Sequence, residues 1–364
     1  VVALMKKLSR GDVRTFSIGF KEDEFDESRY AERVASHLGT DHTAFRLSAE
    51  LTGELLKRVI AHMDEPLGDP SAVPTFLVSK LARESGITVA LSGDGGDELF
   101  CGYERYRKME QLSRLFRIPY PVRKAIARAL KLSGVSASAS LERILGCRKF
   151  SECFLYRMSA WKNGSEDISR MLSGVRGRSQ MVFDEIFTSF SSRSYLDRMM
   201  LTDFNTYLVD DVLTKVDRMS MAVSLEVRVP ILDHRVVEFS RALPLKYKFH
   251  GSTLKFIMKK LLSRYIPDEL VDRPKMGFAI PVTRWLREDM RDELWSSLNR
   301  DRLDKEGLFL PDRVEEALKR FENGEVGMAR FVWGLFVFEK WMEAEMGQSV
   351  NRVPSPSSVS VTQC

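Results

Sequence analysis

The sequence from residue 87 to residue 100 reads Ile-Thr-Val-Ala-Leu-Ser-Gly-Asp-Gly-Gly-Asp-Glu-Leu-Phe. Its first part, 87–91, is a continuous, largely apolar run, and it leads into a turn in which three of the four residues 93–96 are glycine. A short apolar run between turn signals is typical of a buried strand in a parallel sheet. Ligands of open parallel sheets bind beyond the carboxyl ends of the strands, so we expect a functional site at this turn.

The segments before this turn alternate between strand and helix patterns. Residues 13–20 and 42–47 are rich in β-branched and aromatic side chains and are predicted strands. Helical spacing of apolar residues predicts three helices. They are 27–38, a helix that Ser48 caps and that extends to residue 60, and 76–84. This order predicts an α/β fold in which a parallel sheet is covered on both faces.

The part of the chain after about residue 103 has a different pattern. Strand signals stop there, and helical patterns follow at 121–132, 203–222, 253–265, 312–322 and 328–346. We therefore expect a mostly helical second part, 103–345, after an α/β part, 1–102. The last residues, 346–364, are rich in Ser, Val and Pro and are predicted to be a disordered tail.

Composition excludes several classes of protein. The 364 residues are 44% apolar and 29% charged, which excludes wholesale disorder, a collagen-like repeat and a small disulfide scaffold. The net charge of +5 (56 basic minus 51 acidic residues) is too mild to indicate nucleic-acid binding. The apolar run 331–338 is far shorter than the roughly 18 residues of a membrane span. Four cysteines without metal or disulfide spacing fit a reducing compartment, so we expect a cytoplasmic protein.

The glycine-rich turn carries residues suited to phosphate chemistry. Glycines let backbone N–H groups face an anion or a purine without interference from side chains. Asp94 and Asp97 are three residues apart at the start of a helix and can point into one cleft, where carboxylates suit Mg²⁺. An Asp-rich turn with an N-capping Asp explains the run equally well when it is taken alone.

Two further blocks carry charge. Residues 207–221 are helical in pattern and dense in both charge signs, and on charge alone a solvated face is the better interpretation. The loop Arg-Pro-Lys-Met-Gly-Phe at 273–278 can present Lys275 to phosphate oxygens, although a single loop lysine is normally just solvated.

Five blocks taken together give a family resemblance. They are Phe-Ser-Ile-Gly at 16–19, the Ser-Gly-Asp-Gly-Gly-Asp-Glu-Leu-Phe-x-Gly-Tyr run at 92–103, Asp-x-Leu-x-Lys-x-Asp-Arg-x-Ser-Met at 211–221, Ser-Leu-Glu-x-Arg-x-Pro at 224–230, and Arg-Pro-Lys-x-Gly-Phe at 273–278. In this order, across about residues 1–345, they resemble the synthetase domain of glutamine-hydrolysing asparagine synthetases. The resemblance implies an adenine nucleotide α-hydrolase-like fold of the ATP-pyrophosphatase type with an all-helical extension.

The resemblance also implies a reaction and its residues. The side-chain carboxylate of aspartate attacks the α-phosphate of ATP, pyrophosphate leaves, and ammonia converts the β-aspartyl-adenylate to asparagine, with ATP and Mg²⁺ required. The positions that match family residues are Ile18, Ser92 and Gly93 for nucleotide binding, Asp94 for adenylate formation, Asp97 for Mg²⁺–pyrophosphate, Lys275 for the catalytic lysine, and Tyr103 for a tyrosine of the catalytic cleft.

One departure from the family pattern changes what is expected of this chain. The family's Ser-Gly-Gly-x-Asp-Ser loop, which grips pyrophosphate, does not occur in the sequence. Residues 1–7 resemble the helix after that loop, so the domain at 1–345 is expected to lack its first strand, the loop and the N-terminal glutaminase domain. Alone, the chain is expected neither to hydrolyse glutamine nor to form the adenylate efficiently. The implied partners are aspartate, ATP, glutamine-derived ammonia and that glutaminase domain; a homodimer is compatible, and neither nucleic acid nor membrane is expected.

Other functions stay open on the same residues. A related amidotransferase or a β-lactam-forming synthetase would use this machinery on another carboxylate, and residues 64–71 are expected to border the acceptor pocket. A non-catalytic relic of the fold is a second alternative, which the presence of Asp97 and Lys275 disfavours. Basic stretches such as 123–131 and 170–178 lack the aromatic residues that stack on bases, which disfavours nucleic-acid binding.

Overall fold

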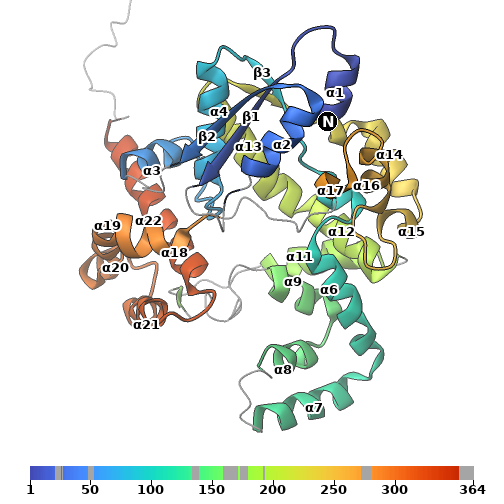
Figure 1. Ribbon diagram of the computed structural model, residues 1–364. Coiled ribbons are helices and arrows are strands. Elements are labelled where there is room, and N and C mark those ends of the chain that lie inside the picture. Colours follow the sequence, from blue (N-terminus) through green and yellow to red (C-terminus); the bar gives the residue numbers. More distant parts are fainter. Residues whose placement is uncertain are drawn as a thin grey trace, which may run out of the picture.

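The computed structural model describes residues 1–20, 26, 28–47, 53–132, 139–158, 171–172, 179–191, 193–271 and 280–351. The strands lie together at the top of Figure 1, and most of the remaining chain is helical. No helix within these ranges has both the length and the apolar character that crossing a membrane requires.

The strands form two parallel pairs. β1 (Arg14–Phe20) pairs with β2 (Asp41–Leu47), and β3 (Val89–Leu91) pairs with β4 (Glu226–Arg228). This confirms the α/β class and the parallel pairing. In the described part of the chain, however, the two pairs are separate two-stranded sheets, whereas a single sheet was expected. β4 also corrects the expectation that strands end before residue 103, because a strand of three residues is too short to show a periodicity.

The exposure of β3 corrects a second expectation. The apolar run 87–91 predicted a buried strand, but the side chains of Val89 and Leu91 are 43% and 42% exposed. β3 is paired with β4 alone among the described strands, and the face that carries these two side chains is only partly covered. The strand still ends directly at the glycine-rich turn.

Helices cover the first strand pair. They are α1 (Val2–Leu8), α2 (Ser28–Leu38), α3 (Gly53–Ile60) and α4 (Ala72–Glu84). α2 packs against both β1 and β2, and α4 packs against β1. α4 begins four residues before the predicted start, because Pro74 is acceptable in the first turn of a helix, where its missing N–H is not needed. The predicted cap, Ser48, lies outside the described residues.

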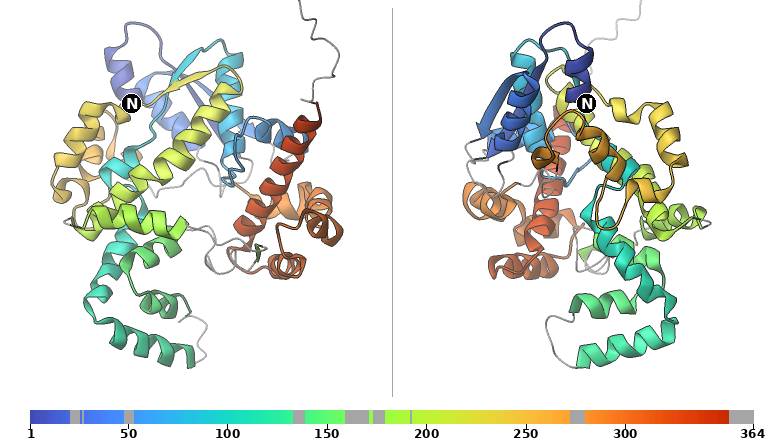
Figure 2. Two further views of the ribbon diagram at one scale, coloured as in Figure 1. Left: turned by 180° about the vertical axis from the view of Figure 1, so that it is seen from behind. Right: turned by 45° about the vertical axis from the view of Figure 1, so that its right-hand side comes forward.

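The middle of the chain is helical. Its elements are α5 (Gly96–Phe100), α6 (Glu104–Ser113), the 3₁₀-helix η1 (Arg114–Arg117), α7 (Tyr120–Leu132), α8 (Ala139–Gly146), α9 (Phe150–Met158), α11 (Ser179–Ser189), α12 (Tyr195–Asn205), the π-helix η3 (Tyr207–Leu213), α13 (Thr214–Met221), the 3₁₀-helix η4 (Pro230–Leu232), α14 (His234–Ala242), α15 (Leu245–Lys248), α16 (Phe256–Leu262) and α17 (Asp268–Val271). Both views of Figure 2 show α7 and α8 projecting beyond the rest of the molecule.

The C-terminal helices gather on one side of the molecule (Figure 1). They are α18 (Val282–Arg284), the π-helix η5 (Trp285–Asp289), α19 (Arg291–Ser297), α20 (Arg300–Glu306), α21 (Pro311–Glu322) and α22 (Met328–Asn351). α22 runs five residues beyond the predicted end at 346, and residues 352–364 lie outside the described part of the chain.

The helix predicted over 203–222 is broken at Thr206. The backbone of Thr206 leaves helical geometry, with φ −128° and ψ −83°, and η3 follows it before α13 begins. The Thr206 hydroxyl donates to the Thr202 carbonyl at 2.8 Å and satisfies one of the groups that the break releases. π-Helical turns often lie at functional sites, and η3 carries two residues of the site described below.

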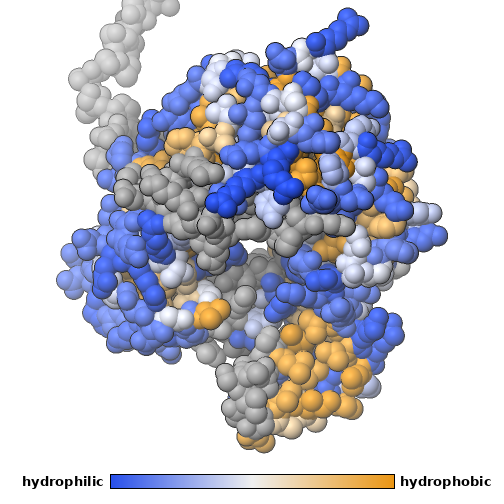
Figure 3. All heavy atoms as spheres, viewed as in Figure 1, coloured by the Kyte–Doolittle hydropathy of each residue, from blue (hydrophilic) through white to orange (hydrophobic). Residues whose placement is uncertain are grey.

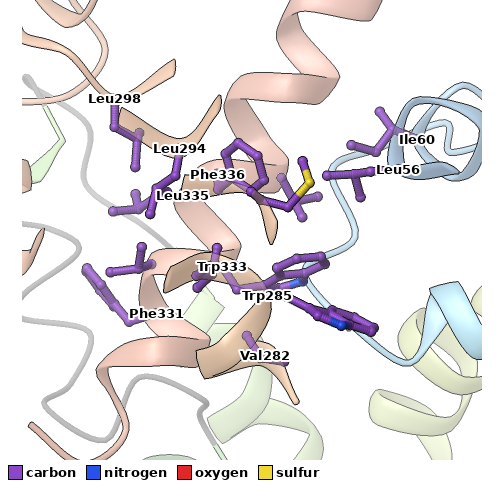
Figure 4. Close-up of a cluster of buried hydrophobic side chains, with 14 of the residues drawn as sticks. Leu56, Ile60, Val282, Trp285, Leu294, Leu298, Phe331, Trp333, Leu335 and Phe336 are labelled. Carbon is purple, nitrogen blue, oxygen red and sulfur yellow. The ribbon is translucent and has the colours of Figure 1, made fainter. Parts of the chain in front are cut away.

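Two large hydrophobic clusters hold the helices together. The first joins α3 and α4 to the C-terminal helices, with Trp285 and Trp333 at its centre and their ring centroids 6.0 Å apart (Figure 4). The second joins α6, α9, α11 and α12 around Tyr106 and Phe154, which are fully buried. β1 contributes Ile18 to the first cluster, and α6, which follows the glycine-rich turn, packs in the second.

The projecting helices α7 and α8 carry an apolar surface. Val122, Ile126, Leu132 and Leu141 are large exposed hydrophobic residues of these two helices. Figure 3 shows apolar side chains gathered at this end of the molecule.

Candidate functional site

The turn after β3 is anchored to the sheet and open to a ligand. The Ser92 N–H donates to the Arg228 carbonyl at 2.9 Å and extends the pairing of β3 with β4. The Ser92 hydroxyl donates to Asp94 Oδ2 at 2.8 Å, so the two side chains are held together. A Cβ added at Gly93 would meet no atom within 4 Å, which means that another molecule can approach the backbone there.

The next part of the turn needs glycine for a steric reason. Gly95 has φ +79°, a left-handed conformation that side chains disfavour. A Cβ at this position would also overlap the side chain of Leu232 in η4. Gly95 thus allows the turn between β3 and α5 to pack closely against η4.

Asp97 lies at the start of α5 beside a cation that the sequence did not predict. Its Oδ1 lies 3.1 Å from Lys255 Nζ, just before α16. Lys255 has φ +52°, and its N–H donates to the Cys101 carbonyl at 3.3 Å. This hydrogen bond fixes the backbone that carries the Lys255 side chain. A Cβ at Gly102 would overlap both the Asp97 carboxylate and the Lys255 side chain, so glycine is required there as well.

Glu98 and Tyr103 form a buried pair behind the turn. The Tyr103 hydroxyl donates to Glu98 Oε1 at 2.6 Å, and Glu98 is only 3% exposed. Burial raises the pKa of Glu98 above its usual range, although the hydrogen bond from Tyr103 opposes the rise. Burial, followed by the nearby Glu98 charge, also raises the pKa of Tyr103, so this phenol keeps its proton at neutral pH.

Arg105 connects this pair to a second buried carboxylate. Its guanidinium lies 3.7 Å from the centroid of the Tyr103 ring and 5.0 Å from that of Tyr207. It also pairs with Asp203 at 2.8 Å, and Asp203 accepts a 2.5 Å hydrogen bond from the Tyr106 hydroxyl. Burial raises the pKa of Asp203, and Arg105 and the Tyr106 bond act against that rise. The result is a cation fixed on the face of Tyr103.

A second charged cluster lies between α4 and α13. Lys215 Nζ lies 2.5 Å from Asp69 Oδ2 and donates to Ser71 Oγ at 2.8 Å. Burial alone would raise the pKa of Asp69, but the charge and hydrogen bond of Lys215, with the bonds from Ser71, outweigh it and lower that pKa. Burial, with the charge of Asp69 second, raises the pKa of Asp211 to about 7. Burial is the largest cause that raises the pKa of Tyr207, and the charges of Asp211 and Asp69 raise it further. Because the Tyr207 ring also faces Arg105, this residue lies between the two clusters.

The structure brings together Ser92, Gly93, Asp94, Asp97 and Tyr103, all within one turn and the helices after it. Ile18 lies on the other strand pair, opposite Phe45 in the register, and its side chain is 7% exposed in the first hydrophobic cluster. Lys275 lies outside the described residues.

Several residues of these clusters were not predicted from the sequence. The charge pattern of block 207–221 favoured a solvated face. This holds for the exposed Asp210 and Asp217, but Lys215 is buried and Asp211 is partly buried. The signal was present as the four-residue spacing of Asp211 and Lys215, which places both on one side of a helix. Lys255 gave no signal, because nothing near it in the sequence marks its pairing with Asp97.

The carboxylates at this turn suit a Mg²⁺ ion that is bound mostly by the phosphates of a ligand. No group of three or more His, Cys, Asp or Glu side chains that could hold a metal exists among the described residues. Mg²⁺ characteristically takes one or two protein carboxylates and completes its shell with substrate phosphates and water. Asp94 and Asp97 on an open, glycine-rich turn supply such a set.

Comparison with known proteins gives consistent matches. Residues 1–343 match the family described as asparagine synthase. The chain is 30% identical to asparagine synthetase [glutamine-hydrolyzing] 1 of Bacillus subtilis, over 90% of this chain and 52% of that protein. It is 30% identical to a putative asparagine synthetase [glutamine-hydrolyzing] of Mycobacterium tuberculosis (90% and 50%), and 22% identical to amidase chyE of Penicillium rubens (85% and 49%). The chain spans about half the length of these relatives.

Proposed function

The chain belongs to the asparagine synthase family. We propose that the protein converts aspartate to asparagine in a reaction that cleaves ATP to AMP and pyrophosphate, with ammonia as the nitrogen donor. The observation that carries the proposal is the turn after β3, where Ser92, Asp94 and Asp97 lie on an open glycine-rich backbone beside the cation of Lys255. The names of the relatives support glutamine as the source of the ammonia, which a glutaminase domain would release.

The proposed synthesis of asparagine has two chemical steps. An oxygen of the aspartate side-chain carboxylate bonds to the α-phosphorus of ATP, the bond from that phosphorus to the bridging oxygen breaks, and pyrophosphate leaves. The nitrogen of ammonia then bonds to the carbon of the mixed anhydride, AMP leaves with the carboxylate oxygen, and a proton is released. Negative charge builds up on phosphate oxygens in the first step, so fixed cations and backbone N–H groups lower its barrier most.

The described residues divide this work by position. Ser92 and Gly93 present the backbone that holds the nucleotide, with the Ser92 hydroxyl already directed at Asp94. Asp97 would hold Mg²⁺ together with the phosphates, and Mg²⁺ would neutralise charge on the departing pyrophosphate. Lys255 keeps a positive charge at the same carboxylate, which limits repulsion between Asp97 and an incoming phosphate.

The fold and the remaining residues complete the proposal. The two parallel strand pairs and their helices support an adenine nucleotide α-hydrolase-like fold of the ATP-pyrophosphatase type with a helical extension. Ile18 contacts the nucleotide, Asp94 supports adenylate formation, Lys275 supplies a further cation, and Tyr103 borders the cleft. Glu98 and Arg105 fix the hydroxyl and the ring of Tyr103.

Product balance tests this function. The protein expressed from its complete coding sequence is supplied with ATP, Mg²⁺, aspartate and ammonium, and AMP, pyrophosphate and asparagine are quantified. We expect the three products in equal amounts, and their loss in Asp97→Asn, whereas Asp210→Asn at an exposed position keeps activity. Formation of ADP and inorganic phosphate in their place would contradict the proposal, as would full activity of Asp97→Asn.

The identity of the acceptor carboxylate is tested separately. The relative named an amidase matches 85% of the chain, so proteins with different names share this region. A set of amino acids and other carboxylic acids is screened for pyrophosphate exchange into ATP. Exchange that depends on aspartate supports asparagine synthesis, and exchange that depends on a different acid with none for aspartate assigns the chemistry to that acid.

A further inference from the structure

A small pocket of mixed charge lies beside α5 and is formed by α5, α12, α14 and α15. Its polar lining consists of Glu98, Arg193, Asp197, Ser240, Arg241 and Lys248. The volume open to a water-sized group is about 30 Å³, which is room for about two waters or one carboxylate-sized group.

Lys248 is the unusual member of this lining. It is 5% exposed, and within the described part of the chain its ammonium makes neither a hydrogen bond nor an ion pair. Burial lowers the pKa of Lys248, and the charge of Asp197 opposes that fall. An anion in the pocket would therefore stabilise the charged form of Lys248.

The other charged groups of the lining are two arginines and two carboxylates. Arg193 and Arg241 are exposed and are likewise without an ion pair among the described residues. Each of the two carboxylates accepts a hydrogen bond from a neutral hydroxyl, Glu98 from Tyr103 and Asp197 from Ser194 at 3.0 Å. The lining thus has three basic side chains against two carboxylates, an excess of positive charge.

We propose that this pocket binds a small oxyanion, the carboxylate or phosphate group of a ligand, with Lys248 as the buried cation and Arg193 and Arg241 at the mouth. A planar guanidinium matches the paired oxygens of either group, and a lysine ammonium supplies a compact charge. Ser240 donates its hydroxyl to the Leu99 carbonyl at 2.6 Å, so the pocket wall is attached directly to α5. An occupied pocket therefore adjoins the helix that carries Asp97.

Oxyanion binding by the 364-residue chain tests the proposal. Inorganic phosphate and acetate are titrated separately by calorimetry at constant ionic strength, and the midpoint of thermal unfolding is followed in parallel. The wild-type chain is expected to bind at least one of them with a rise in unfolding midpoint, and the stronger ligand identifies the source as phosphate or carboxylate. Lys248→Met is expected to weaken binding at least tenfold, since it removes a charge-assisted contact of about 1.4 kcal/mol or more.

Two comparisons make the result specific to this pocket. Lys246→Met changes an exposed lysine of the same helix and is expected to bind like the wild type. Arg241→Gln, at an exposed position, is expected to weaken binding by up to about fivefold. If Lys248→Met does not fold, the weakening in Arg241→Gln decides the outcome. The proposal is overturned if neither oxyanion binds the wild-type chain, or if binding is the same in Lys248→Met, which would place the anion elsewhere.

Discussion

The hydroxyl of Tyr106 gives a sharp test of how the site is supported. Tyr106→Phe removes only the donor of the 2.5 Å bond to Asp203 and leaves the buried ring in place. Asp203 is fully buried and then keeps Arg105 as its partner at 2.8 Å. A hydrogen bond to a charged group contributes about 1.5–3 kcal/mol, so we expect a loss of that size in the free energy of unfolding.

Urea unfolding followed by circular dichroism measures this loss. The transition midpoint of Tyr106→Phe is expected to fall while the slope stays unchanged, because the surface exposed on unfolding is the same. Tyr247→Phe removes a hydroxyl from a half-exposed ring and should lie within about 0.5 kcal/mol of the wild type. A Tyr106→Phe midpoint equal to that of Tyr247→Phe would refute the reasoning, because Asp203 would then not depend on this donor.

Three further changes follow from the same geometry. Gly102→Ala places a Cβ against the Asp97 carboxylate and should lower pyrophosphate release at least tenfold with the fold retained by circular dichroism. Lys215→Met leaves Asp69 buried without its cation and should lower the free energy of urea unfolding by about 3–5 kcal/mol. Asp211→Asn should gain stability relative to the wild type as the pH rises from about 4 to 7. The pKa of Asp211 is raised to about 7 in the folded protein, so its protonated carboxyl stabilises the wild type fully below about pH 4, and this stability is lost as the pH rises through 7. Unfolding midpoints measured at several pH values check it.

Each of these changes has a matched control. Gly146→Ala adds a Cβ where no atom lies within 4 Å, and equal activity of the two glycine variants would show that Asp97 is not constrained by Gly102. Lys246→Met should be nearly neutral, and a similar small effect of Lys215→Met would remove the case for a buried ion pair. Asp210→Asn should show no pH-dependent gain, and a flat difference for Asp211→Asn as well would mean that its pKa is not raised.

The elements defined by local patterns could be predicted from the sequence. β1, β2, α2 and α7 were predicted within about two residues of their observed bounds, because apolar periodicity and glycine or turn signals mark them. The glycine-rich turn and its two carboxylates could also be placed, since the residue types there report directly on backbone freedom and charge.

The remaining features depend on contacts that no local pattern records. β4 exists because it pairs with β3, and its three residues carry too little periodicity to be recognised. Lys255 reaches Asp97 through a left-handed backbone position, for which lysine gives no signal. Lys215 looked like one charge among many on a helix, and only the packing of α13 against α4 turns it toward Asp69.

The proposed carboxylate attack on the α-phosphate is tested most directly by isotope transfer. Aspartate labelled with ¹⁸O in its side-chain carboxylate is converted by the protein from its complete coding sequence, and the label in each product is measured by mass spectrometry. Because the attacking oxygen stays with the phosphorus, one ¹⁸O atom is expected in AMP for each asparagine formed. Label in inorganic phosphate, with ADP as the nucleotide product, would contradict the proposed adenylate.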